Sequence, residues 1–106
     1  NWANEIGADP EQPDAPPIAT EFVGTSIASG GDGVARPRYL DALLAENPFV
    51  KFHNEERGYV RCEITPQAWR TDFRTVPYIT RRGAPLQTRA SFLVESGRPG
   101  LNRIAG

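Results

Sequence analysis

Two alternating segments constrain the fold of this chain more than any other feature of its sequence. Residues 59–65 read YVRCEIT and residues 69–76 read WRTDFRTV, and a short connection around Pro66 and Gln67 separates them. Alternation of apolar or small residues with charged ones is typical of β-strands that bury one face. Because the connection is so short, the two segments predict an antiparallel hairpin over residues 59–76.

The charges in these two segments also predict the register of the hairpin. The expected partners are Ile64 with Trp69, Glu63 with Arg70, Cys62 with Thr71, Arg61 with Asp72, and Val60 with Phe73. Two of these pairs join opposite charges across the strands, and each such pair contributes about 0.2–1 kcal/mol. A slip of one residue would carry charged side chains onto the apolar face, so the pattern specifies this register.

Three further segments have the pattern of regular structure. Residues 18–23, IATEFV, predict a short strand, and residues 87–95, QTRASFLVE, predict another with Ala90, Phe92 and Val94 on one face. Residues 37–47, PRYLDALLAEN, predict the one helix, since three leucines share a face and Pro37 suits a first helical turn. The expected fold class is therefore α+β and dominated by strands.

The remaining segments are rich in proline, glycine and polar residues. Residues 8–17 carry four prolines and predict a surface connection. Residues 96–106, SGRPGLNRIAG, predict a flexible tail. One short helix covers the apolar face of a sheet poorly, so we expect the sheet to pack against material outside these residues.

Composition excludes several classes of protein. The 106 residues suffice for one small domain, and 12 basic against 13 acidic side chains give no basic surplus for a stable nucleic-acid partner. No apolar run approaches the roughly 18 residues that span a bilayer, so we expect no transmembrane segment. A single Cys excludes an internal disulfide framework. The chain begins with Asn1 rather than Met, which we expect of a processed or fragmentary start.

The loop within residues 21–33, EFVGTSIASGGDG, resembles a phosphate-binding loop in composition alone. A Walker loop needs a Lys after its last glycine, and none follows Gly33. The alternating acidic ligands of an EF-hand are missing as well. Hydroxyl and glycine N–H groups could still bind an anion, but a plain flexible loop is the favoured interpretation.

No complete active site is visible in the sequence. His53 lies beside acidic residues and could bind a metal or move protons, but a metal site needs further ligands and there is no second His. A structural role for His53 is favoured, and Cys62 is interpreted as a small core residue. Ser26 and Asp32 could complete a triad with His53 on paper, as any chain with one His allows. The sequence thus predicts no catalytic residue and no metal ligand.

Five segments together resemble the C-terminal part of PhoD-type alkaline phosphatases, which have the metallophosphatase fold. The segments are NWAN at 1–4, ATEFVGTSIASGGDG at 19–33, NPFVKFHNEERGYVRCEITPQAW at 47–69, DFRTVPYIT at 72–80, and TRASFLVESGRPGL at 88–101. No single segment is diagnostic, but their order and spacing are specific as a set. The resemblance implies that residues 1–106 form the C-terminal portion of a metallophosphatase α/β sandwich.

The resemblance also implies an activity, which is metal-assisted hydrolysis of phosphate monoesters and diesters by water. Family members typically use calcium with iron, and a twin-arginine signal exports them to the periplasm or the extracellular space. In the family a stretch like NWAN directly follows a Gly-Asp-x-His-Ser motif of the metal centre. We therefore expect the metal ligands to lie before Asn1, in an N-terminal part of the same domain. Residues 1–106 alone are expected to be inactive and to provide sheet scaffold beside the metal site.

The resemblance places five residues near that site. Asn1 is expected to lie closest, because the missing motif would directly precede it. Thr25 and Ser26 are expected at the exit of a buried strand, EFVGTSI, that points toward the metals. Asn54 and Arg57 are weaker candidates for lining the cleft.

A second interpretation needs no catalysis. The hairpin with its charged outer face and exposed edge would suit a free-standing, β-rich binding or interaction module. A cooperative thermal transition of the isolated chain would favour this alternative, whereas aggregation would argue against it.

Overall fold

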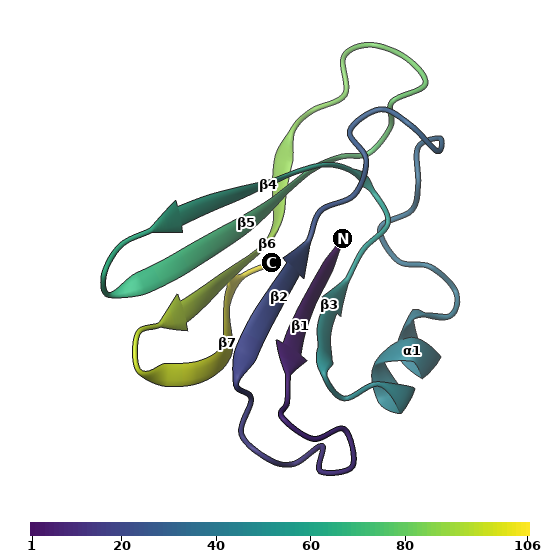
Figure 1. The fold of residues 1–106 in the computed structure, drawn as a ribbon. Coiled ribbons are helices and arrows are strands. Elements are labelled where there is room, and N and C mark those ends of the chain that lie inside the picture. Colours follow the sequence, from purple (N-terminus) through teal and green to yellow (C-terminus); the bar gives the residue numbers. More distant parts are fainter.

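The computed structural model describes residues 1–106 as two antiparallel sheets that face each other, with one helix at their side (Figure 1). The elements in chain order are β1 (Trp2–Ile6), β2 (Ala19–Val23), α1 (Leu40–Glu46), β3 (Val50–His53), β4 (Arg57–Ile64), β5 (Ala68–Val76), β6 (Gln87–Glu95) and β7 (Arg98–Ala105). One sheet has the order β2-β1-β3 and the other β4-β5-β6-β7. The expected strand-dominated fold is confirmed. The helix is too short to cross a membrane.

The core lies between the two sheets. Phe52 of β3 packs on Phe73 of β5 with ring centroids 4.9 Å apart, and Phe92 of β6 meets Phe73 edge-on at 6.0 Å. Ala3 and Ala90 complete this buried cluster. The expectation that the sheet packs against material outside these residues was therefore wrong for its apolar face. The three-stranded sheet covers that face, and of its strands only β2 was expected from the sequence.

The hairpin of β4 and β5 has the predicted register in all five pairs, from Val60 opposite Phe73 to Ile64 opposite Trp69. The expected ion pairs across the strands do not form, because Arg70 Nε instead donates to Asp72 Oδ1 of its own strand at 3.1 Å. The predicted register therefore forms without the expected ion pairs.

The tip of this hairpin projects beyond β1 and β2 (Figure 1). Ile64 is consequently 70% exposed, and Cys62 is also exposed. The interpretation of Cys62 as a core residue was thus wrong, since the facing sheet ends before it.

Helix α1 is shorter than the predicted range of 37–47. It begins at Leu40, and Pro37 precedes it in a turn whose carbonyl accepts a hydrogen bond from Leu40 N at 3.1 Å. The predicted end is close, because Asn47 donates from both its backbone and its side chain to Leu43 O. The predicted strand at 18–23 is β2, and the predicted strand at 87–95 is β6.

The segment predicted as a flexible tail forms a strand instead. Residues 98–105 are β7, which pairs with β6 so that Glu95 lies opposite Arg98. A turn of Ser96 and Gly97 joins the two strands, and Gly97 has φ +75° there, a conformation that glycine adopts without steric cost. This two-residue connection is the hairpin signal that the sequence interpretation missed.

The buried strand implied by the resemblance is also corrected. β2 lies at an edge of its sheet, and its burial alternates, with Phe22 half-buried and Val23 39% exposed. Residues 8–17 contain no helix or strand and lie in the connection from β1 to β2.

Candidate functional site

The five residues expected near the site are brought together at one end of the three-stranded sheet. β1 runs antiparallel to both of its neighbours, with Trp2 opposite Val23 of β2 and opposite His53 of β3. The ends of β2 and β3 therefore flank the start of β1 (Figure 1). Asn1 starts this arrangement, Thr25 and Ser26 follow β2, Asn54 follows β3, and Arg57 opens β4.

Asn1 is fixed on both sides by its neighbours. Its side-chain Nδ2 donates to Asn54 Oδ1 at 3.0 Å and to Glu56 O at 3.1 Å, and its Oδ1 accepts from Thr25 N at 3.1 Å. Backbone hydrogen bonds in both directions also join Asn1 to Asn54. Asn1 is 6% and Asn54 1% exposed. The amide of Asn1 is thus used within the chain, and its role is to set the position of the chain at this point.

The buried carboxylate of Glu56 holds the side chain of Asn54 in place. Glu56 Oε1 accepts from Asn54 Nδ2 at 3.1 Å and from Thr75 Oγ1 at 3.2 Å. It also accepts from Nε and Nη2 of Arg89, each at 2.8 Å. Sequence reasoning missed Glu56 and Arg89, because no local pattern shows that residue 89 faces residue 56. Glu56 itself had a weak signal, as one of the two acids between the candidate residues Asn54 and Arg57.

Arg57 connects the start of β4 to the loop after β2. Its Nη1 donates to Thr25 Oγ1 at 2.8 Å and to Ser26 Oγ at 2.9 Å, while its buried Nε has no partner. Gly33 lies against the same segment, where an added Cβ would come within 1.8 Å of Glu55 O. The loop over residues 24–33 is therefore strand-exit structure that packs on Arg57, not an open phosphate cradle.

His53 is held as a structural residue. It is 6% exposed, its ring centroid lies 3.9 Å from that of Trp2, and its Nε2 lies 3.0 Å from Glu55 Oε2. Burial lowers the pKa of His53. The imidazole is therefore neutral near pH 7. Ser26 and Asp32 do not form a triad with His53. Ser26 is hydrogen-bonded to Arg57 and Ser29, and Asp32 accepts a hydrogen bond from Ile79 in the loop between β5 and β6.

This arrangement of NWAN, the β2 exit and the segment from Asn54 to Arg57 can be compared with known proteins. A family model described as a PhoD-like phosphatase matches residues 1–73. The chain belongs to the PhoD-like phosphatase family. Alkaline phosphatase D of Bacillus subtilis (strain 168) is 42% identical over 105 residues, which cover 99% of this chain and 18% of that protein.

A solved structure of PhoD has the same fold with a TM-score of 0.93, at 42% identity over 99% of this chain and 20% of the other. The recognition of the PhoD-like family from the sequence is thus confirmed. The chain spans about a fifth of the length of the PhoD proteins it matches.

The donors of this PhoD-like chain do not fit a calcium or iron centre. The structure contains no group of three or more His, Cys, Asp or Glu side chains that could hold a metal ion. The acids near the site are already engaged, Glu56 by Arg89 and Asp32 by the N–H groups of Ile79 and Thr80. We therefore derive no metal ligand and no catalytic step from these residues.

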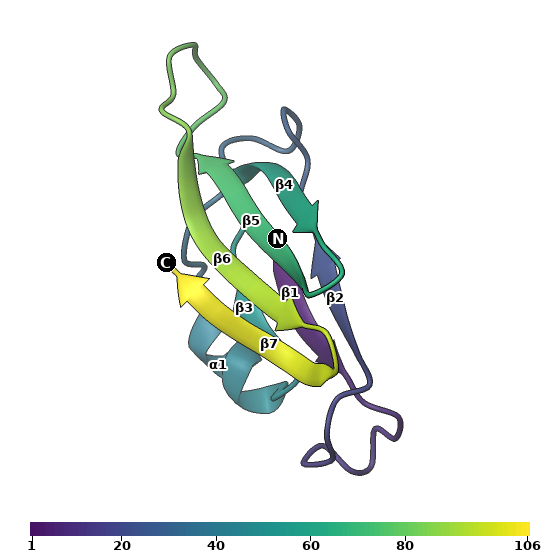
Figure 2. The ribbon, with the colours of Figure 1, turned by 90° about the vertical axis from the view of Figure 1, so that its left-hand side faces the viewer.

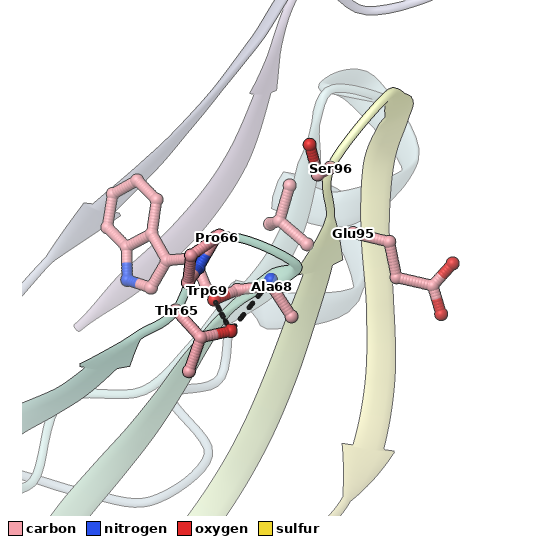
Figure 3. Close-up of a pocket in the computed structure, with 7 residues that line it drawn as sticks. Thr65, Pro66, Ala68, Trp69, Glu95 and Ser96 are labelled. Atoms are coloured by element: carbon pink, nitrogen blue, oxygen red, sulfur yellow. Dashed lines mark hydrogen bonds between the residues drawn. The ribbon is translucent and has the colours of Figure 1, made fainter.

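A pocket of about 240 Å³ lies at the far end of the β4–β5 hairpin from Asn1 (Figure 3). The loop between the strands is closed by Thr65 Oγ1, which accepts a hydrogen bond from Ala68 N at 3.1 Å. Trp69 and Glu95 also line the pocket. A single carboxylate beside an indole provides no set of groups for phosphate chemistry, so this pocket is not the candidate site.

Proposed function

We propose that this chain is the scaffold part of an enzyme that hydrolyses phosphate monoesters and diesters. The observation that carries the proposal is the match to PhoD over 99% of the chain with a TM-score of 0.93. The relative from Bacillus subtilis is named an alkaline phosphatase, which supports a phosphoric ester hydrolase as the whole protein. The phosphate ester would be the substrate of that whole protein.

The metal ions of such an enzyme would be held by residues outside this chain. Calcium and iron are the ions we propose, and their function would be to supply the Lewis acidity for attack by water on phosphorus. The residues described above have no free carboxylate cluster to offer them. The N-terminal part of the same domain is therefore the proposed partner of this chain.

The contribution of this chain would be to place the segment that precedes Asn1. Asn54 and Glu56 hold Asn1 through buried hydrogen bonds, and Arg89 ties Glu56 to the four-stranded sheet. A group displaced by about 1 Å can cost a hundredfold in rate, so rigid support of this kind matters to catalysis. On the β2 side, the position of Asn1 would be supported by Thr25, Ser26 and Arg57.

We also propose that the enzyme acts in the periplasm or outside the cell. Family resemblance alone supports this location. Fractionation of the source cells, with activity measured in each fraction, tests it directly.

A second function is favoured by one observation, which is that the two sheets enclose their own core of phenylalanines. A chain with its own core could serve as a free-standing binding module. On this alternative the isolated chain would unfold cooperatively and bind a partner without hydrolysing any ester.

Hydrolysis of p-nitrophenyl phosphate and bis-p-nitrophenyl phosphate separates the two functions. We would assay the 106-residue chain and the product of the complete reading frame, each with added calcium and iron. The proposal predicts turnover by the complete product and none by the chain alone. Turnover by the chain alone that survives repurification would contradict the scaffold role. Absence of turnover by the complete product would contradict the proposed activity.

A further inference from the structure

A basic pocket lies at the open edge of the sandwich, beside α1. α1 packs against β3, the edge strand of one sheet. β7 is the edge strand of the other sheet (Figure 2), and its Arg103 lines the same cavity as Leu40 and Leu44 of α1. This cavity has a volume of about 240 Å³. Its basic lining residues are Arg36, Lys51, Arg89 and Arg103, and no carboxylate lines it. In a chain with net charge −1, this is a local concentration of positive charge.

Arg103 is the basic residue of this pocket that lacks an ion pair. Arg36 pairs with Asp41, Lys51 Nζ lies 3.6 Å from Glu5 Oε1, and Arg89 pairs with Glu56. The guanidinium carbon of Arg103 instead lies 5.2 Å from the ring centroid of Phe52 and 5.8 Å from that of Phe92.

Stacking on a ring uses the face of a guanidinium and leaves its N–H edge available. That edge matches the spacing of two oxygen atoms on a phosphate or a carboxylate. Lys51 on the same lining has only a long contact of 3.6 Å to Glu5 and a side chain that is 42% exposed, so its ammonium can also offset a second negative charge, which favours phosphate over carboxylate.

The rest of the pocket wall is apolar. Leu40 and Leu44 of α1 line it together with Phe52. We propose that this pocket binds a small phosphate-bearing anion, with the phosphate at Arg103 and an apolar group against Leu40 and Leu44. The proposal depends on the charge and shape of the pocket and not on the proposed hydrolysis.

Calorimetric titration with phenylphosphonate tests the proposal, because this ligand has a phenyl group and cannot be hydrolysed as an ester. The protein from the complete reading frame would be compared with Arg103→Gln and Arg82→Gln at constant ionic strength. Arg82 is exposed and lies outside the pocket, so its variant makes the same change of charge elsewhere. We expect Arg103→Gln to weaken one binding event at least tenfold and Arg82→Gln to leave every Kd unchanged. Equal binding by both variants, or no binding to the unaltered protein at millimolar ligand, would overturn the proposal.

Lys51→Gln is a second variant whose folding is safer, since the Lys51 side chain is 42% exposed. We expect it to weaken the same binding event severalfold. Unchanged affinity in this variant would remove Lys51 from the site and with it the argument for a doubly charged ligand.

Two further ligands test the chemistry of the anion. Benzoate keeps the ring but carries one negative charge, and inorganic phosphate keeps the charge but has no ring. Phenylphosphonate should bind more tightly than either. Equal binding of benzoate would overturn the assignment to phosphate, and equal binding of inorganic phosphate would overturn the apolar contact. Binding needs no turnover, so failure here is distinct from failure of the proposed hydrolysis.

Discussion

Arg89 and Glu56 form an ion pair that joins the two sheets of this protein. Nε and Nη2 of Arg89, on β6, each lie 2.8 Å from Oε1 of Glu56, which lies between β3 and β4. The Glu56 side chain is 6% exposed and the Arg89 side chain 33%. Because Glu56 also holds Asn54, which holds Asn1, the pair supports the whole corner at which the five candidate residues meet.

Glu56→Ala should destabilise the protein more than loss of an exposed pair does. Removing one partner of a buried pair costs about 3–5 kcal/mol, and we expect about 3 kcal/mol here because Arg89 still reaches solvent. Urea unfolding followed by circular dichroism measures the change. The control is Glu95→Ala, which removes the exposed pair with Arg98 and should cost about 0–1 kcal/mol. Similar losses in both variants would show that Glu56 does not link the sheets.

Phe73→Ala should create a cavity at the centre of the core. Phe73 is 0% exposed and lies between Phe52 and Phe92, so we expect the free energy of unfolding to fall by about 3–5 kcal/mol. Phe49→Ala makes the same chemical change at a residue that is 53% exposed, and it should cost far less. Thermal unfolding of both variants checks the difference. A Phe73 variant as stable as the Phe49 variant would contradict a core shared by the two sheets.

Gly33→Ala and Gly31→Ala separate backbone strain from steric contact. Both glycines have positive φ, +71° for Gly33 and +75° for Gly31, so each variant should lose about 1–2 kcal/mol from strain. A Cβ at residue 33 would also lie 1.8 Å from Glu55 O, whereas residue 31 has nothing within 4 Å. Gly33→Ala should therefore be clearly the less stable of the two in a denaturant titration. Equal stabilities would mean that the loop does not pack on Glu55.

Asp32 should give the protein a pH-dependent link between two loops. Hydrogen bonds from Ile79 N at 2.7 Å and Thr80 N at 3.0 Å lower the pKa of Asp32 below its ordinary 3.8. A lowered pKa in the folded state means that the link is complete above the ordinary pKa and is lost as pH falls through the folded value.

Amide chemical shifts of Ile79 and Thr80 should therefore titrate together with a midpoint below 3.8. Asp32→Asn, which cannot ionise, should abolish that titration. A midpoint at or above the ordinary pKa would show that the loops are not joined through this carboxylate.

The β4–β5 hairpin shows how much of the fold a local sequence pattern can predict. Its register and the boundaries of β6 were predicted from the alternation of apolar and polar residue types within single segments, because a slip of one residue would move every side chain to the other face. The candidate residues were found differently, through resemblance to a family, and the antiparallel pairing of β1 with β2 and β3 explains why they meet. Their part in phosphate chemistry stays a proposal.

Three strands could not be read from the sequence in the same way. β1, WANEI, lacks a regular alternation, β3 has only four residues, and β7 contains a proline and a glycine. β1 and β3 lie far apart in the chain and pair with each other, and their sheet helps to bury Phe52, Phe73 and Phe92 between two layers, whereas β7 pairs with its neighbour in sequence, β6. The contact between Glu56 and Arg89 likewise joins residues that are distant in the chain. Alternation within a segment is encoded locally, whereas the contact of two distant side chains depends on how the sheets stack, and only the folded chain determines that.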